Sequence, residues 1–345
     1  MKVQKWLMGV ILIAGSLWLQ TGHVVQAEGA SFSVSPQIPE NQRSAVSNYY
    51  DLVVKPGTTQ NLSLSVTNRT AEVRHVRLSV TDAWSQSNGQ VSYSPGAPAD
   101  DSAEHRLTDL GPAPMTLTLA PKEVKTVTVP LKIPPDGFRG VLLGALYLVD
   151  NERSGGEESG GVAIKNRFAT VVGVQLQTST GAINGIVPHL KLLRVGAGVH
   201  DNQPSVLATL QNDRPTYWGK MRLKATVTKR DQKTVVMQRE AANYAVAPNS
   251  HFNFAVTNQK ALDPGDYTLN LAVTGPHGHW QFRRNFSILV GEADSINKEV
   301  GLKRRFVMPW WGWALIGLAL LVVVAACWWV LHRPSKSLLR ERREA

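Results

Sequence analysis

The sequence predicts an all-β protein: two tandem immunoglobulin-like β-sandwiches followed by one C-terminal transmembrane helix. Three observations support this prediction. Apolar and polar residues alternate through most of the chain, turn-forming residues recur at short intervals, and one long segment near the C-terminus carries no charge. Alternation with a period of two is typical of strands that bury one face, and many short strands separated by turns are typical of sandwiches.

Composition limits the classes of function. The chain has 345 residues and a formal net charge of +11. Its single cysteine, Cys327, excludes a disulfide scaffold and a thiolate zinc site, because both need several sulfur atoms. The excess charge lies at the chain ends, since residues 28–302 carry 27 Lys and Arg against 24 Asp and Glu. We therefore interpret the basicity as a membrane-topology signal and expect no nucleic-acid partner.

Residues 1–27 have the order of a secretory signal peptide. Lys2 and Lys5 precede the apolar run Trp6–Leu19, and small residues lead up to Ala27. We expect cleavage after Ala27. A retained N-terminal anchor is the less favoured alternative, because the apolar run is short.

The segment Trp310–Leu331 contains 22 residues without a charge. At 1.5 Å per residue a helix of this length extends about 33 Å, enough to cross a hydrocarbon core of about 30 Å. The tail at residues 332–345 is basic, which predicts a type I single-pass protein with the tail in the cytoplasm. No LPxTG-type sortase motif precedes the segment, so we expect the anchor to be kept. An ectodomain without cysteine fits a Gram-positive cell surface better than a eukaryotic one.

The first sandwich is predicted over residues 31–180. Runs such as Leu62–Val66, Val76–Val80 and Val127–Ile133 alternate strictly between apolar and polar residues. A Gly-rich stretch at residues 153–161 is either a hairpin loop or the interdomain linker. We favour the hairpin and a boundary near residue 180, with a boundary near residue 160 as the alternative.

The second sandwich is predicted over residues 181–292, and a polar stalk over residues 293–309. We expect strands at His189–Val195, Ser205–Gln211, Lys220–Lys229, His251–Val256, Tyr267–Val273 and Trp280–Leu289. The run Leu262–Tyr267 contains Asp-Pro-Gly-Asp before the tyrosine. This is typical of a tyrosine corner, in which the Tyr hydroxyl binds a backbone group just upstream.

No catalytic or cofactor motif is present, so we predict a protein that is not an enzyme and holds no cofactor or metal. His277 and His279 form the closest histidine pair, but zinc needs three or four ligands, and we favour a surface loop. The pairs Asp100-Asp101 and Glu157-Glu158 lack the spaced oxygen pattern of a calcium loop, so we interpret them as solvated charges.

Four aromatic residues near predicted turns are the candidate contacts for a partner: Trp84, Tyr93, Tyr217 and Trp218. Aromatic rings at a surface stack on sugars or anchor a protein partner. The favoured alternative is that most of them cap the ends of the sandwiches.

Motifs in both halves resemble one family. They are Phe32-x-Val34-x-Pro36 and Val66-x-Asn68 in the first half, and Ala247-Pro248-Asn249-Ser250-x-Phe252 and Gly265-Asp266-Tyr267-Thr268-Leu269 in the second. Together with the order of signal peptide, two β-domains, membrane helix and basic tail, they are similar to the WxL-interacting proteins of lactic-acid bacteria and enterococci.

That resemblance implies a peptidoglycan-binding first domain and a second domain that binds host components. It also implies assembly with WxL-domain surface proteins, with host extracellular-matrix proteins as further partners. Two alternatives remain at this point. A glycan-active enzyme would need two carboxylates converging in a cleft, and a structural spacer would bind no ligand.

Overall fold

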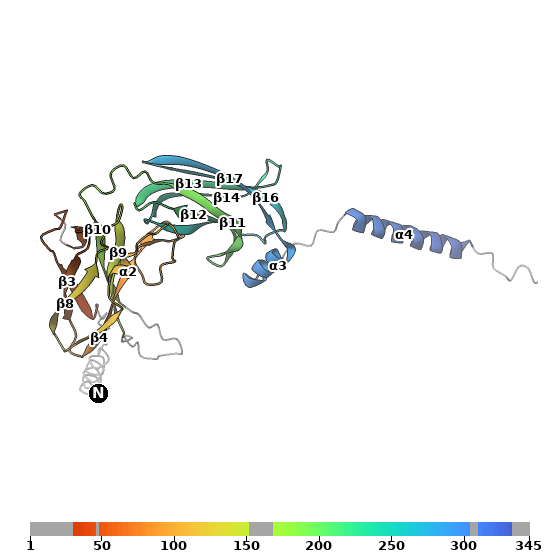
Figure 1. Ribbon diagram of the computed structural model, residues 1–345. Coiled ribbons are helices and arrows are strands. Elements are labelled where there is room, and N and C mark those ends of the chain that lie inside the picture. Colours follow the sequence, from red (N-terminus) through yellow and green to blue (C-terminus); the bar gives the residue numbers. More distant parts are fainter. Residues whose placement is uncertain (1–29, 46–47, 152–167, 304–309, 333–345) are drawn as a thin grey trace, which may run out of the picture.

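The computed structural model describes residues 30–45, 48–151, 168–303 and 310–332. Strands dominate, and Figure 1 shows two β-sandwiches and one long C-terminal helix. The predicted fold class is therefore confirmed. The predicted signal peptide, the Gly-rich stretch 153–161 and the basic tail from residue 333 lie outside the described residues.

The first sandwich packs a three-stranded sheet, in the order β1-β3-β8, against a five-stranded sheet, in the order β2-β10-β9-β4-β7. Among its described strands, only β2 and β10 pair in parallel. The alternating apolar residues face the core, as the sequence predicts. Leu62, Leu64 and Val66 of β3 are fully buried, while the residues between them are partly exposed. The strands are β1 (Phe32–Gln37), β2 (Tyr50–Val53), β3 (Thr59–Asn68), β4 (Arg74–Asp82), β7 (Met115–Leu119), β8 (Val124–Lys132), β9 (Leu142–Asp150) and β10 (Ala169–Gln177).

A long excursion leaves the first sandwich after β4. It contains the short hairpin β5 (Trp84–Ser85) and β6 (Val91–Ser92) and one helical turn, α2 (Leu107–Leu110). Arg106 binds Asp82 through Nη2 at 2.7 Å, and Thr108 donates to the same carboxylate at 2.8 Å. These bonds tie the returning chain to the end of β4.

The second sandwich packs β11-β12-β15 against β14-β13-β16-β17. Six of its strands overlap the predicted ones, but β14 was not predicted. Its pairing with β13 shifts register at three places, and such bulges interrupt the alternation from which a strand is recognised. The strands are β11 (Leu190–His200), β12 (Gln203–Asn212), β13 (Trp218–Lys229), β14 (Val235–Val246), β15 (Ser250–Thr257), β16 (Gly265–Gly275) and β17 (Gly278–Ile288).

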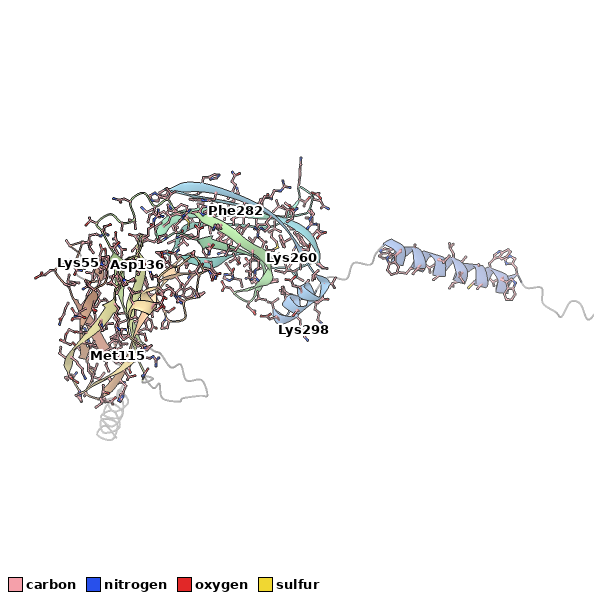
Figure 2. The ribbon with its side chains drawn as sticks, in the orientation of Figure 1. Lys55, Met115, Asp136, Lys260, Phe282 and Lys298 are labelled. Carbon is pink, nitrogen blue, oxygen red and sulfur yellow. The ribbon has the colours of Figure 1, made fainter. Side chains whose placement is uncertain are left out.

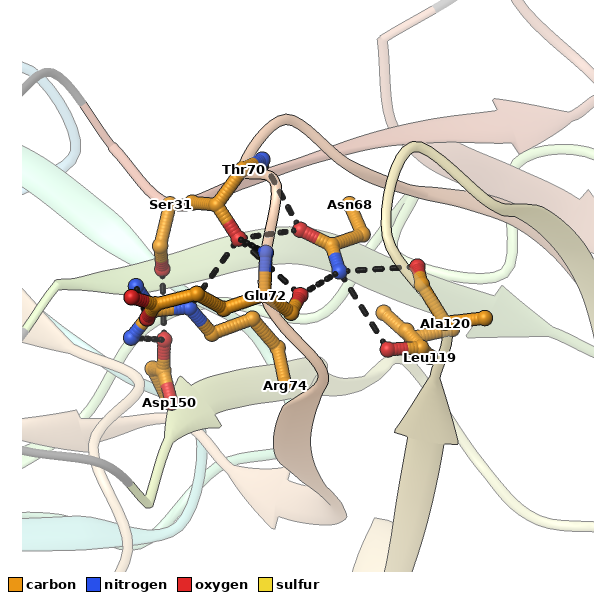
Figure 3. A network of polar contacts seen from close by, with 8 residues as sticks. All are labelled: Ser31, Asn68, Thr70, Glu72, Arg74, Leu119, Ala120 and Asp150. Atoms are coloured by element: carbon orange, nitrogen blue, oxygen red, sulfur yellow. Dashed lines mark hydrogen bonds and ion pairs between the residues drawn. The ribbon is translucent and has the colours of Figure 1, made fainter.

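Each sandwich places a fully buried asparagine at the end of the central strand of its three-stranded sheet. The amide of Asn68, the last residue of β3, donates to the carbonyl oxygens of Glu72, Leu119 and Ala120 at 2.7–3.2 Å, as Figure 3 shows. Asn212, the last residue of β12, donates in the same way to the carbonyl oxygens of Thr216 and Ala247 at 2.7 and 3.0 Å. Buried backbone carbonyls need such partners, so each asparagine holds together the loops at one end of its sandwich.

In the first sandwich this network continues to a buried ion pair. Thr70 donates to Asn68 and accepts from Arg74, whose guanidinium lies 3.8 Å from Asp150 (Figure 3). Ser31 donates to the same Asp150 carboxylate at 2.6 Å. The N-terminal end of β1 is thereby joined to the end of β9.

The predicted stalk differs from the structure, because its first part is the helix α3 (Val290–Glu299). Ala293 and Ile296, three residues apart, are buried against the second sandwich. Asn297 accepts from the backbone N–H of Leu262 at 2.8 Å and donates to its carbonyl at 2.9 Å. Residues 293–299 are therefore part of a helix that packs one face on the second sandwich.

The C-terminal helix is α4 (Trp310–Leu331). Its segment Trp311–Trp329 has a mean hydropathy of 2.1 over its most apolar window and is long and apolar enough to cross a membrane. Its hydrophobic side chains are exposed rather than packed in a protein core.

The two sandwiches contact each other through the Ala-Pro-Asn-Ser motif at residues 247–250. The hydroxyl of Ser85 accepts from the backbone N–H of Ala247 at 2.9 Å and lies 2.6 Å from the hydroxyl of Ser250. Asn249 donates to the carbonyl oxygen of Ser102 at 2.7 Å. The excursion between β4 and β7 therefore serves as the docking platform for the second sandwich.

Asp100 lies at the centre of this junction and is buried, which corrects the expectation of a solvated charge. Its carboxylate accepts from the Ser102 hydroxyl at 2.6 Å, from Gln211 at 2.8 Å and from His251 at 2.8 Å. Burial alone would raise the pKa of Asp100, but the hydrogen bonds from Ser102, His251 and Gln211 outweigh it and hold the pKa below its ordinary value. Only the neighbouring Asp101 is exposed.

Gly89, in the β5–β6 turn, completes the junction. It has a φ of +86°, its carbonyl accepts from the backbone N–H of Ala245 at 2.8 Å, and a Cβ at this position would overlap the ring of Tyr244. Tyr244 in turn donates to the carbonyl of Ser87 at 3.1 Å. Glycine is needed here both for the backbone conformation and for the close approach.

The predicted tyrosine corner is present, because the Tyr267 hydroxyl donates to the carbonyl of Asp263 at 2.8 Å. Tyr267→Phe should lower the free energy of unfolding by about 1–2 kcal/mol through loss of this bond. Thermal or denaturant unfolding measures the effect. Tyr217→Phe is the control, because that ring is 42% exposed, and it should change stability by less than about 0.5 kcal/mol. Equal stability of Tyr267→Phe and the native protein would contradict the assignment.

Asp100→Asn should destabilise the junction by about 1–3 kcal/mol at neutral pH, because a buried acceptor loses its charge-assisted bonds. The pKa of Asp100 is lower in the folded protein than in the unfolded chain, where it is about 3.9. The ionised carboxylate therefore contributes its full stabilisation above the unfolded pKa, and this stabilisation is lost as the pH falls through the folded pKa. The difference between the native protein and the variant should therefore shrink below about pH 4. Asp101→Asn should leave stability unchanged at every pH, and a pH-independent effect of Asp100→Asn would contradict this account.

Gly89→Ala should destabilise the protein by roughly 1–3 kcal/mol more than Gly96→Ala, because the added methyl group must displace the Tyr244 ring. Gly96 is the matched control, with a φ of +91° and no heavy atom within 4 Å of the added Cβ. Both variants place an alanine at a positive φ and so carry the same kind of backbone strain. The difference between their melting temperatures, measured by calorimetry, therefore reports the contact between the sandwiches. Identical melting of the two variants would show that the contact contributes nothing.

Candidate functional site

The junction leaves a groove of about 750 Å³ between the two sandwiches. From the first sandwich, β10 contributes Val171, Gly173 and the buried Gln175. The start of β13 and the end of β14 contribute Gly219 and Ala245 from the second. This volume lies within the range of about 300–1,000 Å³ that is usual for ligand sites.

Four aromatic residues line the groove: Tyr49, Tyr93, Tyr217 and Trp218. Three of them were candidate contacts from the sequence, and they come from segments more than a hundred residues apart. Trp84 is not part of the lining, because its indole donates to the carbonyl of Ser94 at 3.3 Å within its own hairpin.

The aromatic residues differ in what they offer a ligand. Trp218 is only 3% exposed and packs against Trp280 in a tilted pair with ring centroids 4.6 Å apart, so most of its surface belongs to the core. Tyr217 beside it is 42% exposed. Burial, and then the neighbouring Tyr217, raise the pKa of Tyr93 above its ordinary value, so its phenol keeps its proton at neutral pH. Both tyrosines line the groove.

Gly173 keeps the groove open. A Cβ at this position would meet only Tyr49, at 3.5 Å, so a side chain would fit sterically but would fill the space above β10. Neither Tyr49 nor Gly173 is marked by a sequence motif. They reach the groove only because β2 pairs with β10, with Tyr50 opposite Val174.

The polar groups of the groove are amides rather than carboxylates. Gln175 donates to Asp51 at 3.0 Å, and Arg43 binds the same carboxylate at 3.0 Å, so the Gln175 amide is held in a fixed orientation. No Asp or Glu is among the described lining residues of the groove. Aromatic faces with a few fixed amides suit binding of apolar side chains or sugar rings, whereas glycoside hydrolysis would need paired carboxylates.

The described residues contain no group of three or more His, Cys, Asp or Glu placed to hold a metal ion. His279 lies on β17, and its ring nitrogen is 3.0 Å from the amide of Gln281 in an exposed position. The part of the chain described here therefore offers no metal centre of the usual kind.

Comparison with protein families gives two matches. Residues 32–150 match the peptidoglycan binding domain of the WxL Interacting Protein, and residues 159–298 match the host binding domain of the same family. Both are binding domains of a cell-surface protein. No curated protein matches the chain.

Two solved structures illustrate a weak likeness. A chain of the chaperone–tip adhesin complex of CFA/I fimbriae is 11% identical with a TM-score of 0.29, over 74% of this chain and 98% of that one. The Pseudomonas aeruginosa CupB2 chaperone is 14% identical with a TM-score of 0.24, over 67% and 95% of the two chains. At such TM-scores the likeness carries no inference about function.

The two family matches follow each other along the chain and together span more than half of it. Their order is the one that the sequence motifs predicted. The chain belongs to the family of WxL-interacting proteins.

Proposed function

We propose that this cell-surface binding protein is a membrane-anchored, non-enzymatic adaptor that binds a WxL-domain protein in the groove between its two sandwiches. In this proposal the first sandwich also contacts peptidoglycan and the second contacts host extracellular-matrix proteins. The family matches support binding to these classes of component.

The observation that carries the proposal is the groove itself. Tyr49 and Tyr93 of its lining lie in the peptidoglycan binding match and Tyr217 in the host binding match, so a ligand in the groove would touch both family domains at once. The hydrogen bonds of Asp100 and Ser85 hold the two walls at a fixed separation. A site that is formed before the ligand arrives loses little entropy on binding.

Anchoring is the second part of the proposal. Tryptophans stand at both ends of α4, including Trp311 and Trp329, where the interfaces of a bilayer would lie. With residues 1–27 removed as a signal peptide and the basic tail in the cytoplasm, the sandwiches would stand in the wall layer of a Gram-positive cell. This topology suits a protein that retains partners at the wall.

The mechanism of partner binding follows from the charge of the groove. Its described lining residues carry no charged side chain, so apolar and main-chain contacts would dominate. We expect the affinity for a purified WxL-domain protein to change little between low and high salt, because screening acts on charges. Calorimetric titration of the full-length protein in nanodiscs, at about 0.05 and 0.5 M salt, measures this.

Tyr217→Ala should weaken that binding by about tenfold or more, as expected for an exposed aromatic anchor. Leu193→Ala is a matched control, because this apolar side chain is 44% exposed on β11 and lies outside the groove. Equal losses in the two variants would contradict the groove as the contact. Binding that collapses at high salt would leave the function intact but overturn this mechanism.

Assays on the same purified protein distinguish two other functions from the proposed one. Release of muramyl glycan fragments by the purified protein, together with no binding of a WxL-domain protein, would identify a glycan-active enzyme. No binding to WxL-domain proteins, peptidoglycan or matrix proteins would identify a structural spacer.

A further inference from the structure

The outer face of the sheet formed by β13, β16 and β17 carries a second set of features that the groove does not use. On β13, Leu223 and Ala225 are buried in the core, so Lys224 between them points outward. On β17, Phe282 packs on the core, so its neighbours Gln281 and Arg283 lie on the outer face. Figure 2 labels Phe282 on this sheet.

The strand register brings these outward residues into two adjacent rows. One row runs Lys224, Ala272, Gln281, and the next runs Thr226, Asn270, Arg283. Neighbouring strands lie about 4.8 Å apart, so each row spans roughly 10 Å from β13 to β17. The rows combine two cations with two amides and one hydroxyl.

Ala272 is the smallest residue in these rows and lies on the central strand. The face is hollowed there, with a cavity of about 440 Å³ whose lining includes all six residues of the two rows. Lys224 and Arg283 come from opposite sides of this hollow, on β13 and β17. A ligand group resting over Ala272 would lie between the two positive charges.

The cations of the hollow have no salt-bridge partner within the part of the chain that the structure describes. Among the described residues, no ion pair involves Lys224 or Arg283. Glu240 lies opposite Lys224 in the register, but its carboxylate is 3.5 Å from Arg222. The second sandwich as a whole is also positively charged, because residues 181–302 carry 14 Lys and Arg against 9 Asp and Glu. Residues 28–180, by contrast, carry 13 Lys and Arg against 15 Asp and Glu.

The chemistry of the hollow defines its ligand. Lysine and arginine bind carboxylate or sulfate groups, and the amides of Asn270 and Gln281 bind hydroxyl groups. Phe282 also borders the hollow, but it packs on the core, so the two rows present charges, amides and a hydroxyl rather than an aromatic face on which a neutral sugar could stack. The surface therefore needs both negative charge and hydroxyl groups in one ligand.

We propose that the outer face of β13, β16 and β17 is a binding site for an acidic polysaccharide of the host matrix, one that carries repeated carboxylate or sulfate groups. Negative groups of the polymer lie between Lys224 and Arg283, and its hydroxyl groups bind Asn270 and Gln281. The choice of host matrix rests on the proposed host-binding role of the second sandwich. The site is separate from the groove that takes the WxL-domain protein.

The test is titration of the full-length protein in nanodiscs with a heparin oligosaccharide, with neutral dextran and poly(glycerol phosphate) as comparison polymers. Heparin should bind, more weakly as salt rises, and dextran should not. The double variant Lys224→Gln/Arg283→Gln should lose about tenfold or more in heparin affinity. Both side chains are exposed, so the fold should be unaffected.

The matched control is Lys55→Gln/Lys260→Gln, which removes the same net charge from exposed positions elsewhere (Figure 2). It should retain heparin affinity. Ala272→Leu fills the hollow without changing charge and should also weaken binding. Equal losses in the two double variants would overturn the site in favour of a general charge effect. Tighter binding of poly(glycerol phosphate) than of heparin would overturn the host polysaccharide as its ligand.

The double variant Lys224→Gln/Arg283→Gln should still bind a WxL-domain protein with native affinity. This result keeps the two proposals separate, because each site can then fail without the other. Loss of both activities in this variant would contradict two independent sites.

Discussion

The arrangement of the protein depends on one buried carboxylate, that of Asp100. Its oxygens accept hydrogen bonds from Ser102 in the first sandwich and from Gln211 and His251 in the second. A buried charge without such partners is costly, so the sandwiches are stable together only in the orientation that supplies all of these donors. The groove exists because that orientation leaves a space beside the junction, where Tyr217 faces β10.

The protein has two surfaces of opposite character, the groove at the junction and the outer face of the second sandwich. The groove combines aromatic rings with an amide, Gln175, that is held in place by Asp51. The outer sheet face, by contrast, presents Lys224 and Arg283 on a polar surface. Apolar contacts are insensitive to salt, whereas contacts to exposed cations are screened. In our two proposals, the groove would hold one partner firmly and the outer face would bind a charged polymer reversibly.

Both sandwiches use the same device to close one end. Asn68 and Asn212 are fully buried at the ends of equivalent central strands, and each amide binds carbonyl groups of neighbouring loops. In the second sandwich one of those carbonyls is that of Ala247, whose own N–H donates to Ser85. Loop closure in one sandwich is therefore coupled directly to docking against the other.

The sequence by itself determined the local features. Alternation marked the buried positions of β3, the Asp-Pro-Gly-Asp-Tyr run placed the Tyr267 hydroxyl on Asp263, and the uncharged run set the length of α4. Only the tertiary structure decided the junction and both surfaces. Asp100 and His251 are 151 residues apart, and no local pattern records that they meet. Strand β14 stayed hidden for a related reason, because its bulges are set by pairing with β13 and erase the period that identifies a strand.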